Sequence, residues 1–124
     1  MLLNNLYIIQ SISDFENQIE ASIRLMADHA IFSGHFPRQP VMPGVCMMEM
    51  VAEVIGYQQK RWFRISGAPL VKFLKMIDPR KSSEIHVEIK YDVSSGSIIA
   101  SGRIFSADDV FMKFQLSLVP EFAT

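Results

Sequence analysis

The residue best suited to do chemistry in this sequence is Glu49, a carboxylate within an apolar run. Between Val45 and Ile55 the only charged residues are Glu49 and Glu53. Burial in apolar surroundings raises the pKa of a carboxyl group and favours its neutral form. A carboxylic acid that keeps its proton near pH 7 is what a general acid requires. Glu49 could instead be a structural carboxylate, hydrogen-bonded to the backbone or paired with a base.

Glu53 lies four residues after Glu49, on the same side of a helix. Two carboxylates this close discourage double ionisation, so one of them holds its proton more tightly. The spacing alone does not say which one. Because Glu49 stands deeper in the apolar run, we expect Glu49 to be the acid. We expect Glu53 to be partly exposed, near the polar half of the helix.

His35 offers a general base in the preceding segment. The surrounding residues 34–37 combine stiff backbone with apolar side chains, a setting that favours a neutral imidazole. A lone loop histidine can also be structural or simply exposed. His29 and His86 lack a comparable setting, and we expect His86 to be exposed on a polar strand face. The three histidines are not at zinc-ligand spacing, so no metal site is expected.

Gly44 follows Pro43 at the point where a helix is expected to begin. The first N–H groups of a helix have no intrahelical partner, and the positive end of the helix dipole lies there. Glycine lets a substrate carbonyl approach the backbone closely. These N–H groups could stabilise the oxyanion formed when a thioester loses the proton beside its carbonyl. An equally simple interpretation is a glycine needed only for the turn into the helix.

A long helix and a surrounding sheet must position these residues. Residues 45–61 are apolar on nearly all sides at their start, which predicts a helix wrapped by other structure. Residues 84–91 alternate apolar and polar side chains, as a half-buried strand does. Prolines 37, 40 and 43 make residues 27–43 a stiff loop. One helix with five or six antiparallel strands predicts an α+β fold, a sheet curled around a central helix. The expected strands are 6–11, 18–26, 69–76, 84–91, 98–105 and 110–119.

Length and composition favour an ordinary globular protein. The 124 residues fit a single domain, 1–124, with 49% hydrophobic and 20% charged residues. No apolar run is long enough to span a bilayer, and the start of the chain lacks the features of a secretory signal. Cys46 is the only cysteine, which excludes an internal disulfide. We therefore expect a cytoplasmic protein, with Cys46 as inert packing.

Positive charge is concentrated in one part of the chain. Residues 60–81 hold seven basic residues and one acid, a net +6, whereas the rest of the chain has 5 basic and 12 acidic residues, a net −7. Such a segment on an otherwise acidic protein suggests an anionic partner, although solvated ends of a helix and a strand would give the same pattern. The basic residues are Lys60, Arg61, Arg64, Lys72, Lys75, Arg80 and Lys81.

The segment Gly34–Gly44, followed by Glu49, closely resembles the active-site segment of bacterial 3-hydroxyacyl-acyl carrier protein dehydratases. It keeps Gly-His-Phe-Pro at residues 34–37, two further prolines at 40 and 43, and then Gly44. Glu49 stands fourteen positions after His35, as the acidic residue does in that family. The specific match covers roughly residues 28–56.

The resemblance implies a hot-dog fold and a lyase that needs no cofactor, acting in fatty-acid or related lipid or polyene biosynthesis. His35 would remove the C2 proton of a 3-hydroxyacyl thioester, and Glu49 would protonate the leaving 3-hydroxyl. The products would be a trans-2-enoyl thioester and water, with the thioester carbonyl held by the Gly44 N–H. The other residues expected to contact substrate are Phe36, Pro43, Val45 and Glu53.

The resemblance also implies a homodimer with shared active sites, each combining His35 of one subunit with Glu49 of the other. Such dimers can assemble further into a trimer of dimers. The basic segment 60–81 then becomes a candidate docking surface for the acidic acyl carrier protein. No nucleic acid partner is expected.

Three departures from the family pattern suggest a specialised enzyme. The usual N-terminal stretch rich in Pro-Phe and Asp-Arg is missing, and Glu53 stands where the common dehydratases have Gln. Residues 41–43, Val-Met-Pro, resemble the branch that also isomerises the double bond, yet that branch typically has Asp at the position of Glu49. This mixture favours a dehydratase of a secondary lipid or polyene pathway.

Two other functions remain open on this sequence. A thioesterase on the same fold would hydrolyse the thioester with a carboxylate-activated water, and would not need His35 and Glu49 at this spacing. A non-catalytic acyl-binding or regulatory module would keep the fold and could lose both residues. The presence of the pair favours the dehydratase over either.

Overall fold

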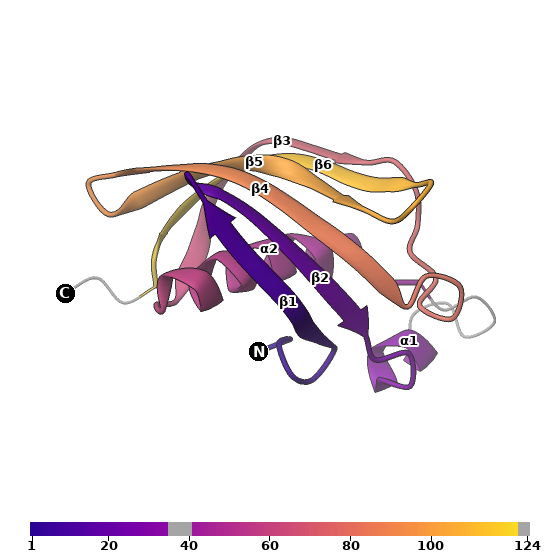
Figure 1. The fold of residues 1–124 in the computed structure, drawn as a ribbon. Coiled ribbons are helices and arrows are strands. Elements are labelled where there is room, and N and C mark those ends of the chain that lie inside the picture. Colours follow the sequence, from indigo (N-terminus) through magenta and orange to yellow (C-terminus); the bar gives the residue numbers. More distant parts are fainter. Residues whose placement is uncertain (35–40, 122–124) are drawn as a thin grey trace.

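One six-stranded antiparallel sheet makes up most of the molecule. The computed structural model describes residues 1–34 and 41–121. Within them the strand order is β1-β2-β4-β5-β6-β3, so β1 and β3 form the two edges. Figure 1 shows the sheet curving over the long helix α2. This confirms the expected sheet curled around a helix. The strands are β1 (Tyr7–Phe15), β2 (Gln18–Leu25), β3 (Phe63–Phe73), β4 (Glu84–Ser94), β5 (Ser97–Phe105) and β6 (Val110–Pro120).

The helix α2 (Gly44–Gln59) is the central element of the core. It begins after Pro43, whose extended backbone (φ −61°, ψ 142°) leads the chain into the first turn. It ends at Lys60, which adopts a left-handed conformation (φ 58°) and donates its N–H to the carbonyl of Gly56. Its buried residues are Cys46, Met47, Met50, Val51, Ala52, Glu53, Val54, Ile55 and Gly56. Cys46 is thus buried, as expected.

Alternating strand residues fill the space between the sheet and α2. In β4, Ile85, Val87, Ile89 and Tyr91 are all buried, while the residues between them face outward. Leu116 and Leu118 of β6 follow the same period and are fully buried. The period of two in the sequence therefore identified the inner face of the sheet correctly.

The first part of the chain differs from expectation in two places. A short helix, α1 (Ala30–Gly34), lies within the segment expected to be a stiff loop. It is favoured by His29, whose Nδ1 accepts a hydrogen bond from the N–H of Ile31 at 3.0 Å. Strand β1 continues to Phe15 rather than ending at residue 11, because a register shift between Ile9 and Ser11 interrupts its alternation without ending its pairing.

Strand β3 begins at Phe63, six residues before the expected start at residue 69. It pairs with β6 from Phe63, opposite Pro120, but its register shifts twice between Ile65 and Leu70. Pro69 is tolerated there because β3 is an edge strand. Because of these irregularities, apolar and polar residues do not alternate strictly along β3, and the sequence pattern does not reveal where the strand begins. The end of β3, at Phe73, lies beside the start of α2.

Candidate functional site

Three carboxylates line one hollow beside α2. The hollow has a volume of about 360 Å³. Its acidic residues are Glu49 and Glu53 from α2 and Glu121 from beyond the end of β6, and Met1, Ala52, Trp62 and Phe63 complete its walls. The two residues that the sequence singled out as an acid pair therefore do share one site.

Glu53, rather than Glu49, is the buried member of the pair. Its side chain is only 4% exposed. The N–H of Leu2 donates to Glu53 Oε2 at 3.0 Å, and the N–H of Leu3 and the hydroxyl of Tyr7 donate to Oε1 at 2.8 and 2.9 Å. The expectation of a partly exposed Glu53 is therefore wrong. All three donors come from the N-terminal residues, which fold back onto α2.

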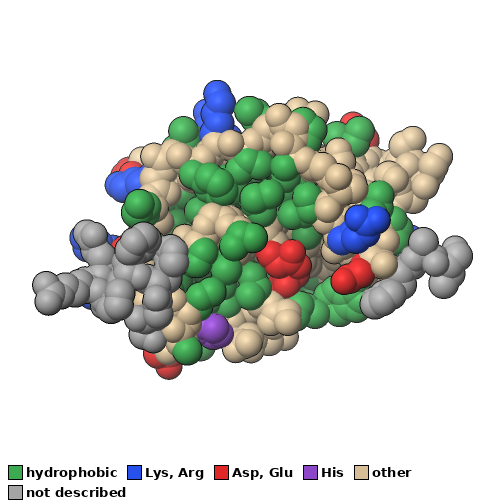
Figure 2. All heavy atoms as spheres, turned by 180° about the vertical axis from the view of Figure 1, so that it is seen from behind, with side chains coloured by type: hydrophobic (Ala, Val, Ile, Leu, Met, Phe, Trp, Pro, Cys, Tyr) green, Lys and Arg blue, Asp and Glu red, His purple; other side chains and the backbone are tan. Residues whose placement is uncertain are grey.

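Glu49 is exposed on the single chain, so the expectation that it lies deeper than Glu53 is also wrong. The apolar run misled because part of α2 is not covered: Val45 is 71% exposed. Figure 2 shows this side of the molecule, with hydrophobic side chains gathered around an acidic one. The pKa of Glu49 is nonetheless raised, first by partial desolvation and then by the negative charge of Glu53. Glu49 thus has the protonation tendency expected of an acid.

Gly44 is the first residue of α2 and lies under the ring of Phe73. A Cβ atom at Gly44 would be 2.7 Å from Phe73 Cζ, so any larger residue would displace the ring. The N–H groups of Cys46 and Met47 both donate to the Pro43 carbonyl, at 3.0 and 3.2 Å. The N–H groups of Gly44 and Val45 lie before these first bonds, as the sequence predicted.

An apolar groove of about 580 Å³ opens at this end of α2. Its walls come from the start of the helix and from the chain that follows β3. It is lined by Val41, Met42, Pro43, Gly44, Val45, Met47, Phe73, Leu74, Lys75 and Met76. Three of the expected substrate-contacting residues, Pro43, Gly44 and Val45, therefore share one groove. His35 and Phe36 lie outside the described residues.

The basic residues of segment 60–81 form two groups rather than one patch. Residues Lys60, Arg61 and Arg64 lie around the end of α2 and the start of β3. Residues Lys72, Lys75, Arg80 and Lys81 lie at and beyond the end of β3. At about 3.3 Å per strand residue, roughly 25 Å separates Arg64 from Lys72. In the second group Lys75 pairs with Asp109 at 2.9 Å and Arg80 with Asp78 at 3.2 Å.

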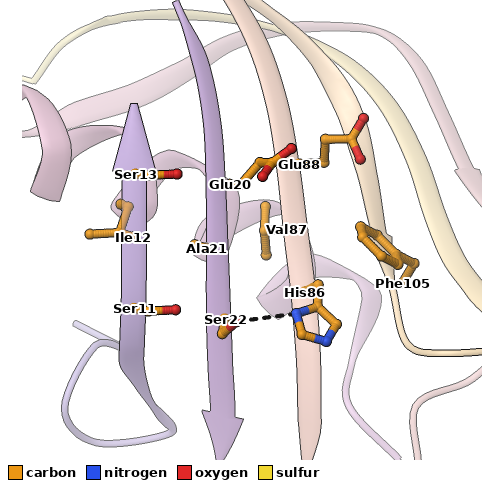
Figure 3. A pocket seen from close by; sticks show the side chains of 10 residues that line it. All are labelled: Ser11, Ile12, Ser13, Glu20, Ala21, Ser22, His86, Val87, Glu88 and Phe105. Carbon is orange, nitrogen blue, oxygen red and sulfur yellow. Dashed lines mark hydrogen bonds between the residues drawn. The ribbon is translucent and has the colours of Figure 1, made fainter. Parts of the chain in front are cut away.

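A second hollow, of about 330 Å³, lies on the outer face of the sheet and had no signal in the sequence analysis. In Figure 3, His86 projects from β4 beside Ser22 of β2, and the two side chains are hydrogen-bonded at 3.2 Å. The His86 ring also lies 5.4 Å from that of Phe105. His86 is half-buried rather than exposed. Because His86 faces away from α2, it cannot be the base that acts on the same substrate as Glu49.

Neither a membrane-spanning helix nor a cluster of metal-binding side chains is present among the described residues. In residues 1–34 and 41–121, no helix is long and apolar enough to cross a membrane. Over the same residues, no three His, Cys, Asp or Glu side chains are grouped in a way that could hold a metal ion.

Comparison with known proteins decides the family. The family model described as ApeI dehydratase matches residues 11–109. The chain belongs to the ApeI-like dehydratase family. This ApeI-like protein is also 31% identical over 108 residues to the 3-hydroxyacyl-[acyl-carrier-protein] dehydratase FabZ of Streptococcus sanguinis, an alignment that covers 72% of the chain and 76% of the relative. FabZ of Paracidovorax citrulli is 26% identical over 102 residues, with 74% and 68% covered. The resemblance seen in the sequence is thereby confirmed.

Solved structures show that this ApeI-like protein has the hot-dog fold. The ApeI:P dehydratase heterocomplex of Xenorhabdus doucetiae matches with a TM-score of 0.72 and 19% identity, over 90% of this chain and 96% of that one. The putative thioesterase YhdA of Lactococcus lactis matches with a TM-score of 0.64 and 9% identity, over 96% of each chain. Because dehydratase and thioesterase names share this fold, the fold alone does not assign a reaction.

Proposed function

We propose that this ApeI-like protein dehydrates 3-hydroxyacyl thioesters carried on an acyl carrier protein, with His35 as base and Glu49 as acid. The observation that carries the proposal is the Glu49 carboxyl, whose pKa is raised beside the start of α2 in a chain of a dehydratase family. The FabZ relatives are named as 3-hydroxyacyl-[acyl-carrier-protein] dehydratases, which supports a thioester substrate attached to an acyl carrier protein.

In the proposed reaction, the His35 imidazole removes the proton from C2 of the substrate. The electrons of that C–H bond form the C2–C3 double bond while the C3–O bond breaks. Glu49 gives its proton to the departing hydroxyl, which leaves as water. The negative charge that develops on the thioester oxygen is stabilised by the N–H of Gly44 at the positive end of α2. The products are a trans-2-enoyl thioester and water.

The apolar groove at the start of α2 is our candidate for part of the acyl site. Methionine side chains such as Met42, Met47 and Met76 adapt to irregular apolar ligands. Phe73, which is 52% exposed, covers Gly44 at one side of this groove. An acyl chain in the groove would bring its thioester next to the helix start. This location supports a hydrocarbon substrate rather than a polar one.

The exposed apolar surface around α2 and β3 supports the dimer. Leu70, Phe73, Leu74 and Met76 are all at least 42% exposed, on or just beyond an edge strand whose outer side lacks a partner strand among the described residues. Contiguous apolar surface of this kind is typical of protein interfaces. We propose that a second copy covers it, and that each active site combines His35 of one subunit with Glu49 of the other.

The direct test is an assay of hydration and dehydration, followed at the absorbance of the enoyl thioester. Removing a general acid or base typically costs about 10²- to 10⁴-fold in rate, so we expect His35→Ala and Glu49→Gln each to lose activity on that scale. Glu84→Gln, which removes the same charge at an exposed site on β4, is the control. Full activity in both active-site variants would refute the mechanism.

The same assay identifies the substrate and excludes the nearest rival. Carriers bearing short, long and aryl-primed 3-hydroxyacyl chains should be compared, because the mixed sequence features favour a specialised pathway. Clear preference for ordinary saturated chains would contradict that part of the proposal. Release of free thiol without formation of an enoyl product would identify a thioesterase instead.

A further inference from the structure

The buried carboxylate of Glu53 takes no part in the proposed reaction, although it lines the same hollow as Glu49. Its two oxygens accept three hydrogen bonds, from the N–H groups of Leu2 and Leu3 and the hydroxyl of Tyr7. In each of these contacts a Glu53 oxygen is the acceptor. No basic side chain pairs with it among the described salt bridges. Its charge is therefore left to act on its surroundings.

Tyr7 is suited to remain a donor to this carboxylate. Burial first, and then the negative charge of Glu53, raise the pKa of Tyr7 far above its ordinary value. The phenol therefore keeps its proton over the whole pH range in which the protein is used. The two backbone N–H groups cannot ionise at all, so all three groups remain hydrogen-bond donors to Glu53.

Glu49 is a second carboxyl group whose pKa the charge of Glu53 raises. It lies one helical turn before Glu53 and lines the same hollow. The other titratable groups that act on Glu49 are Glu121, which also raises its pKa, and the amino group of Met1, which lowers it. Cys46, on the same helix, has its own pKa raised by burial and by these carboxylates. The only cation in this set is thus the Met1 amine.

We propose that Glu53 is a positioning residue: clamped by Leu2, Leu3 and Tyr7, it keeps the proton on Glu49. The N-terminal residues then act on the site through Glu53, without touching the substrate. This role of Glu53 rests on the proposed role of Glu49 as the acid.

The test is a direct titration of the Glu49 carboxyl by carbon-13 NMR of glutamate-labelled protein, with Glu49→Gln to assign the signal. In Glu53→Gln we expect the Glu49 midpoint to fall by roughly one pH unit, the size expected for losing a unit charge one helical turn away near a protein surface. Glu84→Gln, which removes a charge at a remote site, should leave the midpoint unchanged. An unchanged midpoint in Glu53→Gln would overturn the proposal.

Tyr7→Phe keeps the proposal testable if Glu53→Gln does not fold. Removing one of the three donors loosens the Glu53 carboxyl group but leaves it in place, so the Glu49 midpoint should fall by less than in Glu53→Gln. If Tyr7→Phe leaves the midpoint where it is in the parent while Glu53→Gln is unfolded, the proposal fails. Circular dichroism of each variant establishes which case applies.

The rate of dehydration separates this inference from the proposed function. If both hold, activity at high pH is lost as Glu49 gives up its proton, and Glu53→Gln loses activity at a lower pH than the parent. A shifted NMR midpoint in a protein without dehydratase activity would support the role of Glu53 and refute the reaction. If the parent and Glu53→Gln are both active with the same pH profile, the result would support the reaction and refute the role of Glu53.

Discussion

At the scale of single residues, Glu53 lies outside the motif but shares a hollow with Glu49. Glu53 ties residues 2, 3 and 7 to α2, so the N-terminal segment contributes to both stability and electrostatics. A buried carboxylate is costly unless its hydrogen bonds are complete. Here each of the three donors reduces that cost, and losing any one of them should be measurable.

Tyr7→Phe should therefore destabilise the protein. The variant keeps the buried ring but removes a donor to the buried Glu53 carboxyl group, a loss of about 1–3 kcal/mol in the free energy of unfolding. Urea denaturation measures it. Tyr57→Phe is the matched control, because Tyr57 is 52% exposed and should change stability very little. Equal effects of the two substitutions would show that the Tyr7–Glu53 contact does not stabilise the fold.

The sequence motif suggests the proposed catalytic pair, but the apolar pattern along α2 gave the wrong burial for the second carboxylate. His35, Gly44 and Glu49 are recognisable because they lie within fifteen residues and their spacing carries the information. The burial of Glu53 depends on donors about fifty positions away in the chain. No local pattern reports such a contact. Apolar neighbours along α2 suggested the opposite order of burial, since they cannot say which side of the helix the sheet covers.

At the scale of elements, regular alternation made β4, β5 and β6 predictable, and irregular pairing made β3 hard to predict. The close approach of β4 and β5 at Gly102 was not visible in the sequence either. A Cβ atom built at Gly102 would lie 1.8 Å from the backbone oxygen of Glu88. The two strands can pair at this distance only because the residue has no side chain.

Gly102→Ala should disrupt the pairing of β4 with β5. The added methyl group collides with backbone, which cannot rotate away as a side chain can, so we expect a loss of at least about 2 kcal/mol in stability. Thermal or urea unfolding measures it. Ser101→Ala, at the adjacent exposed position of the same strand, should cost far less. If Gly102→Ala proved as stable as Ser101→Ala, the strands would not approach this closely in solution.

At the scale of the whole molecule, residues 1–34 and 41–121 leave the edge strand β3 without a partner on its outer side and apolar side chains exposed beside it, and we propose that a second copy covers them. If each site takes His35 from one subunit and Glu49 from the other, two inactive variants should restore each other. Mixing unfolded His35→Ala and Glu49→Gln chains and refolding them gives one intact site in each mixed dimer. Random pairing then predicts about a quarter of the parent activity. No recovery on mixing would mean that each chain holds a complete site.

The two basic groups make different predictions for carrier docking. Lys72 lies near the end of β3 that meets the apolar groove, and Lys81 lines a hollow together with the groove residues Lys75 and Met76. Lys60 and Arg64 lie around the start of β3. We expect the double variant Lys72→Glu, Lys81→Glu to raise KM for a carrier-linked substrate by on the order of tenfold at low salt. The matched variant Lys60→Glu, Arg64→Glu should change it little. The KM for a short pantetheine thioester, which lacks the carrier, should not change in either double variant. The reverse order would place docking at the other end of β3.

The position of Met1 at the rim of the acidic hollow has a practical consequence for preparing the protein. Fusing a purification tag ahead of Met1 converts its ammonium group into a neutral amide. Because that ammonium lowers the pKa of Glu49, the tagged protein should hold the Glu49 proton to a higher pH. Tagged and untagged preparations would then show different pH profiles for one unchanged active site, so kinetic comparisons require cleavage of the tag or its relocation.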